Sequence, residues 1–417
     1  MKKRAVIIGA GIALFAVFQI AGGLIASSGF FTDGRFGCDL RLRRNEIRCA
    51  HQGVNSFRIW TRETTLSGFT PITRPDMENL PRAPGDAVVH AYPPWHTAMF
   101  YFYGWLPEQM CLSLMSVVFG LCLFFIVSEC VRISKAHFEH YGLAVGLSLA
   151  VISYFIAQCF VFLNYGVLVL AAFLLMNRAL EKGHDVAAGL CWAVMMVKPQ
   201  VGLLFVWPLF WHRHYRTIVT ATVACLAGTF FTSLQVHESM IDLILQIPQI
   251  GKPYGAGGLV DRVLGLAIGK SYPFVGMLFF FLLMGLLTWA LRRNRDFIVS
   301  CVPVVVVVPL WTYVQEHDYV IFVIALLVLA ERMFAARKFD RWVALGGVYF
   351  LSILFIHLWR MAVHFHAFDP AGFSKIYSLV ELLSQMALVA VAALLIREEW
   401  LRRHRGTVEL RSSPLSF

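Results

Sequence analysis

The chain has 417 residues, of which 58% are hydrophobic and 15% charged, and its mean hydropathy is +0.67. Soluble domains carry roughly 25% charged residues, so this composition excludes a soluble protein and predicts one that is solvated by lipid. The net charge is +11, but the Lys and Arg residues lie in short clusters between apolar runs, which argues against a nucleic-acid-binding domain and is typical of residues that set membrane orientation.

The first predicted element is an apolar run over residues 5–27, preceded by Met1-Lys2-Lys3-Arg4. A basic start followed by an apolar run is compatible with a cleaved signal peptide or with an uncleaved membrane anchor. The apolar core of a signal peptide usually has about 7–15 residues, which is shorter than this run. The sequence therefore favours the anchor.

A long polar segment, residues 28–108, follows the anchor and is predicted to be an extracytoplasmic loop with short interfacial helices. Residues 40–52 are compatible with a short helix on the membrane face, and Asp39 could be its N-cap or a catalytic carboxylate. A disulfide between Cys38 and Cys49 is the alternative local structure. In a helix their Cα atoms would be about 16 Å apart, beyond disulfide reach, so helix and disulfide exclude each other. We favour the helix.

The same segment ends with Tyr92-Pro93-Pro94-Trp95, followed by an aromatic stretch from Phe100 to Trp105. Two consecutive prolines fix the backbone and predict that a helix begins at Trp95. The aromatic stretch is typical of side chains at a membrane–water interface.

Apolar runs long enough to cross a bilayer recur along the rest of the chain. Placing every basic cluster in the cytoplasm is self-consistent and puts both termini there. The sequence therefore predicts an all-α polytopic membrane protein, a single domain over residues 1–417 with about 12 transmembrane or re-entrant helices. The uninterrupted spans are expected at 5–27, 109–131, 141–160, 165–180, 217–235, 272–291, 341–360 and 377–396.

One apolar stretch, 186–211, is interrupted by Lys198-Pro199-Gln200. Both of its ends are cytoplasmic when the basic clusters are placed in the cytoplasm. Each arm, however, would be only about 18 Å long as a helix, which is too short for a full crossing. The interruption is therefore predicted to lie below the outer surface, where protein or a water-filled cavity must surround it. Lys198 could extend its ammonium to the membrane surface or bind a lipid phosphate there.

A second stretch, 297–333, is interrupted by Gln315-Glu316-His317-Asp318, which faces outward in this topology. These ionisable residues could form a solvated turn, or they could orient a phosphate or an acceptor. Glu316 and Asp318 would share one side of an extended segment, as metal ligands do. Because the chain contains no Asp-x-Asp motif, we predict no cofactor and assign no metal ligands. A divalent metal remains an alternative.

The order of these elements resembles the family 87 glycosyltransferases, membrane enzymes of the GT-C class, over roughly residues 1–335. The resemblance rests on an external Asp followed by an Asn-Pro-aromatic element, on Tyr-Pro-Pro, on Lys-Pro, and on a late His-Asp pair. Ser56 replaces the usual proline, and Asn164-Tyr165-Gly166 stands where Asn-x-Gln is common. The matching residues are Asp39, Asn55-Ser56-Phe57, Tyr92-Pro93-Pro94, Lys198-Pro199 and His317-Asp318.

The resemblance implies a GT-C-like bundle that transfers one sugar, a hexose or a pentose, from a polyprenyl-phosphate donor to a glycan or lipid acceptor. The reaction would invert the anomeric centre on the extracytoplasmic side of a bacterial inner membrane, as in the biosynthesis of envelope polysaccharides. Asp39 would act as the base. The residues expected to bind the donor phosphate are Lys198, Arg43, Arg44 and His317. Those expected to bind substrate are Asn55, Tyr92, Trp95, Gln200, Glu316 and Asp318.

Two other classes of function share several of these features. A transporter or flippase of lipid-linked sugars also has broken helices and buried charges, but it needs no external carboxylate, and we see no repeat between the two halves of the chain. A polymerase or ligase that moves whole glycans would share the polar outer face.

Overall fold

The computed structural model describes residues 2–26, 36–56, 92–137, 141–247, 273–294, 297–311, 316–335, 343–349, 351–352, 380, 383–384, 386–398 and 401. Within these ranges the backbone forms helices and turns and contains no strand. The predicted all-α class is thereby confirmed for the described part of the chain. The number of crossings and the sidedness stay predictions.

Seventeen helical elements carry labels in this part of the chain. The first four are α1 (Lys2–Ala26), α3 (Cys38–His51), α5 (Pro94–Met99) and the 3₁₀ helix η2 (Tyr101–Gly104). The central ones are α6 (Glu108–His137), α7 (Tyr141–Phe162), α8 (Gly166–Glu181), α9 (Asp185–Met195), α10 (Pro199–Gly202), η3 (Leu203–Phe205), α11 (Val206–Trp211), α12 (Tyr215–Val236) and α13 (Met240–Gln246). The last are α15 (Pro273–Leu291), α16 (Phe297–Trp311), η6 (Glu316–Phe322) and α17 (Val323–Ala335).

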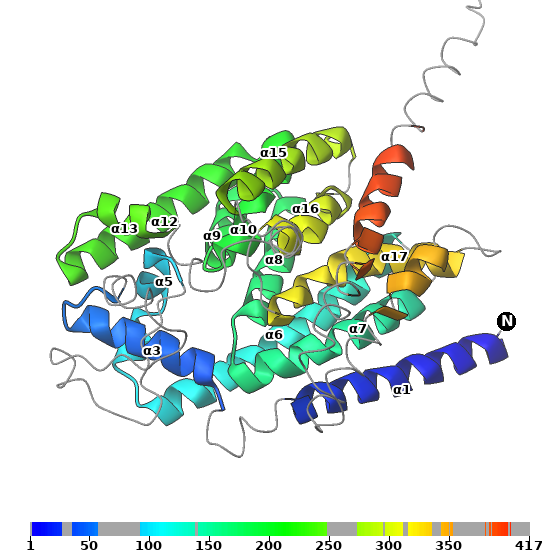
Figure 1. Cartoon of the computed structure of the whole chain (residues 1–417), viewed down its shortest axis with the longest axis horizontal. Helices are drawn as coiled ribbons and strands as arrows, with labels where there is room; N and C mark the ends of the chain where they lie inside the picture. The colour runs from blue at the N-terminus through cyan, green and yellow to red at the C-terminus, as the bar shows by residue number, and fades with distance from the viewer. Residues whose placement is uncertain are drawn as a thin grey trace, which may run out of the picture.

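Helix α8 lies near the centre of the molecule and connects its two sides (Figure 1). It packs against α6 and η6 as well as α9, which in turn packs against α12. On the other side α7 contacts α17 and α1, the dark blue helix at the edge of Figure 1. The short helix α5 packs on α12, so the end of the 28–108 segment is attached to the bundle.

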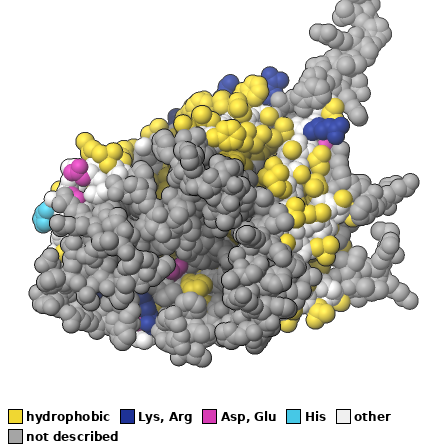
Figure 2. Space-filling view, in the orientation of Figure 1, with side chains coloured by type: hydrophobic (Ala, Val, Ile, Leu, Met, Phe, Trp, Pro, Cys, Tyr) yellow, Lys and Arg dark blue, Asp and Glu magenta, His cyan; other side chains and the backbone are white. Residues whose placement is uncertain are grey.

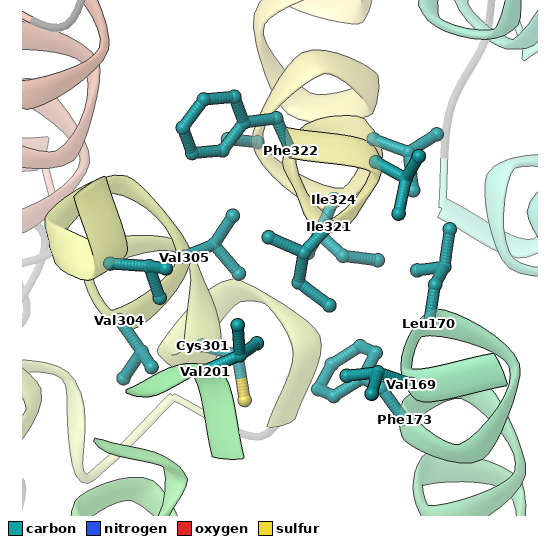
Figure 3. Packing of buried hydrophobic residues seen from close by; sticks show 14 of the residues in the cluster. Val169, Leu170, Phe173, Val201, Cys301, Val304, Val305, Ile321, Phe322 and Ile324 are labelled. Atoms are coloured by element: carbon teal, nitrogen blue, oxygen red, sulfur yellow. The ribbon is translucent and has the colours of Figure 1, made fainter. Parts of the chain in front are cut away.

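The apolar core lies where α8, α10, α16 and the η6–α17 segment meet. Figure 3 shows Leu170 and Phe173 of α8 with Val305 of α16 and Ile321 and Phe322 of η6, and all five are buried. Between membrane helices lipid tails are as apolar as the side chains, so close packing rather than escape from water holds these elements together. This core fixes η6 against α8, which matters for the site below.

Helix α12 has one face typical of contact with lipid and one face typical of contact with other helices. Its exposed face carries large apolar side chains, whereas its buried face carries small and polar ones, which let neighbouring helices approach closely. The exposed residues are Val219, Val223, Leu226, Phe230 and Leu234. The buried residues include Thr217, Ala221, Cys225, Thr229 and Thr232.

Three helical segments among the described residues are long and apolar enough to cross a membrane by length and composition: Glu108–Lys135, Gly142–Phe162 and Tyr215–Val236. They indicate a membrane protein. The edge of the molecule formed by α15 also presents a band of hydrophobic side chains (Figure 2), with Phe279, Leu282 and Leu286 more than half exposed.

The predicted spans before residue 300 correspond to helices. The runs at 5–27, 109–131, 141–160, 165–180, 217–235 and 272–291 are α1, α6, α7, α8, α12 and α15. The runs at 341–360 and 377–396 are helical where described, at 343–349, 351–352, 380, 383–384 and 386–398, and their other residues lie outside the described ranges. The predicted interruption of 186–211 is present, because α9 ends at Met195 and α10 begins at Pro199.

Candidate functional site

The turn between α7 and α8 places Asn164 at the start of a buried helix. Helix α7 ends at Phe162, and the next residue, Leu163, adopts a left-handed conformation with φ of 49°. This reversal lets the backbone N–H of Asn164 donate to the carbonyl of Cys159 at 3.0 Å. A left-handed leucine costs about 1–2 kcal/mol, and such strain is frequent at functional sites.

The break between α9 and α10 places Lys198 inside the protein. The indole N–H of Trp192 donates to the carbonyl of Gly202 at 2.9 Å, and that of Trp95 donates to the carbonyl of Met196 at 3.0 Å. These bonds satisfy two of the carbonyl groups near the interruption. Lys198 itself is only 1% exposed, so its side chain does not extend to the membrane surface in this structure.

The start of α3 positions Asp39. Gly37 has φ of 68°, and its N–H donates to the carbonyl of Val161 at 2.8 Å, which fixes the start of α3 against the end of α7. The expectation that Asp39 is the N-cap is wrong, because Gly37 occupies that position and Asp39 lies in the first turn. The predicted helix is present as α3, and Cys49 is a free, buried thiol.

The start of η6 supplies a second carboxylate, that of Asp318. The expectation of an extended segment here is wrong, because Glu316–Phe322 winds into a 3₁₀ helix, which removes the alternation of side chains on two sides. Asp318 is 4% exposed. The side chains of Glu316 and His317 lie outside the described residues.

These four segments bring their polar side chains together in one chain of hydrogen bonds. The side-chain amide of Asn164 donates to Oδ2 of Asp39 at 2.5 Å. Its Oδ1 accepts from Nζ of Lys198 at 2.6 Å and from the N–H of Gly166 at 2.9 Å. Nζ of Lys198 also donates to Oδ1 of Asp318 in a buried ion pair. We call Asp39, Asn164, Lys198 and Asp318 the bridged cluster.

The bridged cluster contains two carboxylates and a single ammonium. Lys198 and Asp318 are each 2% exposed in their side chains, and a buried ion requires an opposite charge or hydrogen bonds close by. Two of the three N–H donors of Lys198 are used by Asn164 and Asp318. Asp39 is half-buried, and Asn164 is the one described residue that hydrogen-bonds it.

Tyr92 lies beside the bridged cluster. The guanidinium of Arg43 lies 4.6 Å from the centre of the Tyr92 ring and pairs with the buried Glu46 at 2.5 Å. Burial raises the pKa of Tyr92 well above its usual range, with Arg43 opposing this shift and the carboxylates of Asp39, Asp318 and Glu46 adding to it. The Tyr92 phenol is therefore protonated at neutral pH. Its hydroxyl has no hydrogen-bond partner among the described residues.

The other predicted site residues hold elements together. Both Nε and Nη2 of Arg44 donate to the carbonyl of Leu106, at 3.1 and 2.8 Å. The amide of Asn55 donates to Glu238 at 2.6 Å. Asp39 lies in the first turn of α3 and Asn55 follows its C-terminal end, so Asn55 lies at the opposite end of this helix from the cluster.

Trp95 and Gln200 lie at the interruption itself. Trp95 is buried and holds the carbonyl of Met196, whereas Gln200 lies in the first turn of α10 and is half-buried. Helix α5 begins at Pro94, one residue earlier than the two prolines predict, because proline fits the first helical position, where no N–H is needed.

Sequence reasoning did not assign roles to Asn164 and Glu46. The signal for Asn164 was a polar amide between two apolar runs. In the structure its side-chain oxygen accepts from the N–H of Gly166, two residues later. The signal for Glu46 was its spacing of three residues from Arg43, which allows an ion pair on one helix face.

Within the described ranges, no three His, Cys, Asp or Glu side chains lie close enough together to hold a metal ion. The neighbouring carboxylates of the bridged cluster are instead connected through Lys198 and Asn164.

The described part of the chain is all-helical, and its fold and this site indicate a membrane protein with a buried cluster of charges between its helices. Residues 90–242 match the model of Glycosyltransferase family 87, which confirms the resemblance inferred from the motifs and indicates a glycosyltransferase. The matched segment contains Tyr92, Asn164 and Lys198, whereas Asp39 and Asp318 lie outside it. No curated protein and no solved structure matches this chain.

Proposed function

We propose that this glycosyltransferase moves one sugar, a hexose or a pentose, from a polyprenyl-phosphate donor to a glycan or glycolipid acceptor on the extracytoplasmic side of a bacterial inner membrane. The observation that carries the proposal is the bridged cluster, in which Asp39 and Lys198 are joined through one amide. A carboxylate that can take a proton and a cation beside it are the two elements that this reaction requires. The match to a glycosyltransferase family supports the reaction type.

In the proposed reaction an acceptor hydroxyl attacks the anomeric carbon of the donor sugar. The new bond joins acceptor oxygen to anomeric carbon, the bond from that carbon to the phosphate oxygen breaks, and the hydroxyl proton passes to Asp39. Attack opposite the departing polyprenyl phosphate inverts the anomeric centre. Asn164 occupies Oδ2 of Asp39 and no described residue hydrogen-bonds Oδ1, so that oxygen is available to an acceptor.

The negative charge that develops on the departing phosphate requires hydrogen-bond donors. Lys198 has one N–H that neither Asn164 nor Asp318 uses, and the protonated Tyr92 hydroxyl lies beside the same cluster. Arg43 lies over the Tyr92 ring, and His317 precedes Asp318 in the chain. We assign the phosphate to Lys198, Tyr92, Arg43 and His317. Arg44 has its guanidinium occupied by the Leu106 carbonyl and is a weaker candidate.

The test uses the purified full-length protein with a short-chain polyprenyl-phosphate sugar and a panel of glycan and glycolipid acceptors. We expect release of polyprenyl phosphate together with a glycosylated product, and a loss of about 1,000-fold in kcat in Asp39→Asn, which cannot accept the proton. The matched control is Glu129→Gln, a buried carboxylate on α6 that pairs with Arg132 and Arg178.

Glu129→Gln should keep kcat within about twofold while lowering thermal stability. Turnover by Asp39→Asn at the wild-type rate would remove Asp39 from the base role. Transport of the intact lipid-linked sugar across vesicles, without release of polyprenyl phosphate, would instead identify a flippase.

A further inference from the structure

The side chain of Asn164 has a single orientation consistent with its neighbours. Its Oδ1 faces two donors, the ammonium of Lys198 at 2.6 Å and the N–H of Gly166 at 2.9 Å. Rotating the amide by 180° would set its NH₂ group against both donors and its oxygen against the carboxylate of Asp39. Asn164 is 3% exposed, so water does not replace either partner. The amide N–H is thereby directed at Asp39.

The partners of Asn164 come from separate parts of the chain. Asp39 belongs to α3, Lys198 to the break between α9 and α10, and Gly166 to the first turn of α8. The amide bridges the two charged groups, and the ammonium at its oxygen polarises it toward stronger donation to the carboxylate. A direct ion pair would leave Lys198 attached to the group that must accept a proton. The intervening amide keeps the charges apart while fixing their geometry.

We propose that Asn164 is a positioning residue that holds the Asp39 carboxylate in its reactive orientation and couples it to Lys198. This inference rests on the proposed function, because it assigns Asn164 a role in the reaction through Asp39. Asn164 touches neither the donor nor the acceptor in this assignment. Its loss should therefore lower kcat and leave the donor KM nearly unchanged.

Asn177 provides a matched control on the same helix. It is 2% exposed, and its amide donates to the carboxylate of Glu181 at 2.8 Å, near the opposite end of α8. Both residues are thus buried amides that donate to a carboxylate. Asn177→Ala and Asn164→Ala should lower the melting temperature by similar amounts, whereas only Asn164→Ala should affect catalysis.

The experiment compares kcat, donor KM and melting temperature of the full-length protein in detergent, with a short-chain polyprenyl-phosphate sugar as donor. Asn164→Ala should lower kcat about 30-fold, the equivalent of one hydrogen bond to a charged group, with the donor KM within about threefold. Asn164→Asp should lower kcat further, because a second carboxylate cannot donate to Asp39 and repels it. Asn177→Ala should retain kcat within about twofold.

The exchange variant Asp39→Asn/Asn164→Asp separates positioning from pairing. Its residue 39 donates to the new carboxylate, which still accepts from Lys198 and Gly166, so the melting temperature should recover toward wild type. Its kcat should stay as low as that of Asp39→Asn, because position 39 lacks a base.

The two proposals can fail separately. If Asn164→Ala keeps the wild-type kcat while Asp39→Asn is inactive, the inference about Asn164 is wrong and the proposed function stands. If Asp39→Asn is fully active, or if the wild-type protein releases no polyprenyl phosphate, the proposed function fails and the role of Asn164 falls with it.

Discussion

The two ends of α8 each carry a cluster of polar side chains, and the clusters are built differently. At the N-terminal end, the bridged cluster joins residues from four segments far apart in sequence. At the C-terminal end, a second group, which we call the Glu129 cluster, joins residues of only α6 and α8. Its members are Glu129, Arg132, Asn177, Arg178 and Glu181.

The Glu129 cluster is balanced, with two arginines and two glutamates. Glu129 pairs with Arg132 at 2.8 Å and with Arg178 at 2.7 Å, and the arginine side chains are 37% and 43% exposed. The bridged cluster has two carboxylates for one ammonium and contains a left-handed leucine at its turn. A balanced, partly hydrated group on regular helices ties those helices together. The bridged cluster contains the buried pair Lys198–Asp318 and lies beside strained backbone, and such strain is frequent at functional sites.

The largest expected difference between the clusters is in stability after loss of a cation. Lys198→Met removes the ammonium that pairs with the buried Asp318 and should cost about 3–5 kcal/mol, with activity lost. Arg178→Met should cost less than about 1 kcal/mol, because the Arg178 side chain is 43% exposed and Glu129 keeps Arg132. Unfolding by SDS in mixed micelles measures both. The double variant Lys198→Met/Asp318→Leu should recover much of the loss, and a failure to recover would show that the ion pair is not the cause.

Two glycines with left-handed backbone sharpen the comparison further. Gly37 has φ of 68° and a substituent there would collide with Leu112, whereas Gly183, which follows α8, has φ of 72° and open space around it. Gly37→Ala should therefore destabilise by about 2–3 kcal/mol and Gly183→Ala by about 1 kcal/mol. Only Gly37→Ala should lower kcat, since it displaces the start of α3 and with it Asp39. Equal kcat values in the two variants would contradict the assigned position of Asp39.

A smaller effect is expected from the hydroxyl of Tyr92. Tyr92→Phe keeps the ring that packs on Arg43 but removes the proposed donor to the phosphate, so kcat should fall about 10-fold with little change in melting temperature. Tyr103→Phe is the control, because burial raises its pKa to about 12 and, among the described residues, its hydroxyl donates to the sulfur of Met115, at 3.5 Å. Steady-state kinetics on the two variants test the assignment, which an unchanged kcat in Tyr92→Phe would contradict.

The smallest expected effect is a pH dependence at the far end of α3. His51 donates from Nε2 to the carbonyl of Tyr101 at 3.0 Å, and burial lowers the pKa of His51 below its ordinary value of 6.5. As the pH falls, the His51 of the unfolded chain is protonated before that of the folded chain. The stability that neutral His51 contributes is therefore fully present above about pH 6.5 and is lost as the pH falls through the folded pKa. The melting temperature should drop by no more than about 3 °C on acidification, and His51→Phe should remove that increment. An unchanged pH dependence in His51→Phe would assign it to another group.

Hydropathy predicted many of the described helices, because it is a property of local sequence, whereas the orientation inferred from the basic clusters stays a prediction. The predicted ends of the spans at α6, α7, α8 and α12 lie within a few residues of the helix ends in the structure. The interruption at Lys198 was predicted from the shortness of the two apolar arms beside it. The position of Asp39 in its helix was wrong, because a left-handed Gly37 can precede a helix as readily as a polar cap residue.

The contacts of the site could not be predicted in the same way. Asn164 lies 125 residues from Asp39 and 34 from Lys198 in the sequence, and their meeting depends on how α3, α8 and α10 pack. Hydrophobic periodicity determines which face of a helix is buried, but it does not specify which polar residues face one another at a helix end. The motifs therefore predicted Asp39 and Lys198 as site residues, but not the amide that joins them.

Helix α3 is fastened at both of its ends and near its middle. Before it, Gly37 holds the end of α7, and beyond it Asn55 holds Glu238, which follows α12. Arg44 donates to the carbonyl of Leu106, just before α6. Helix α3 thus connects α7 to the end of α12, and these two helices cannot separate without breaking one of these hydrogen bonds. For the proposed polyprenyl-phosphate donor, this predicts that the lipid chain reaches Asp39 without separating α7 from α12.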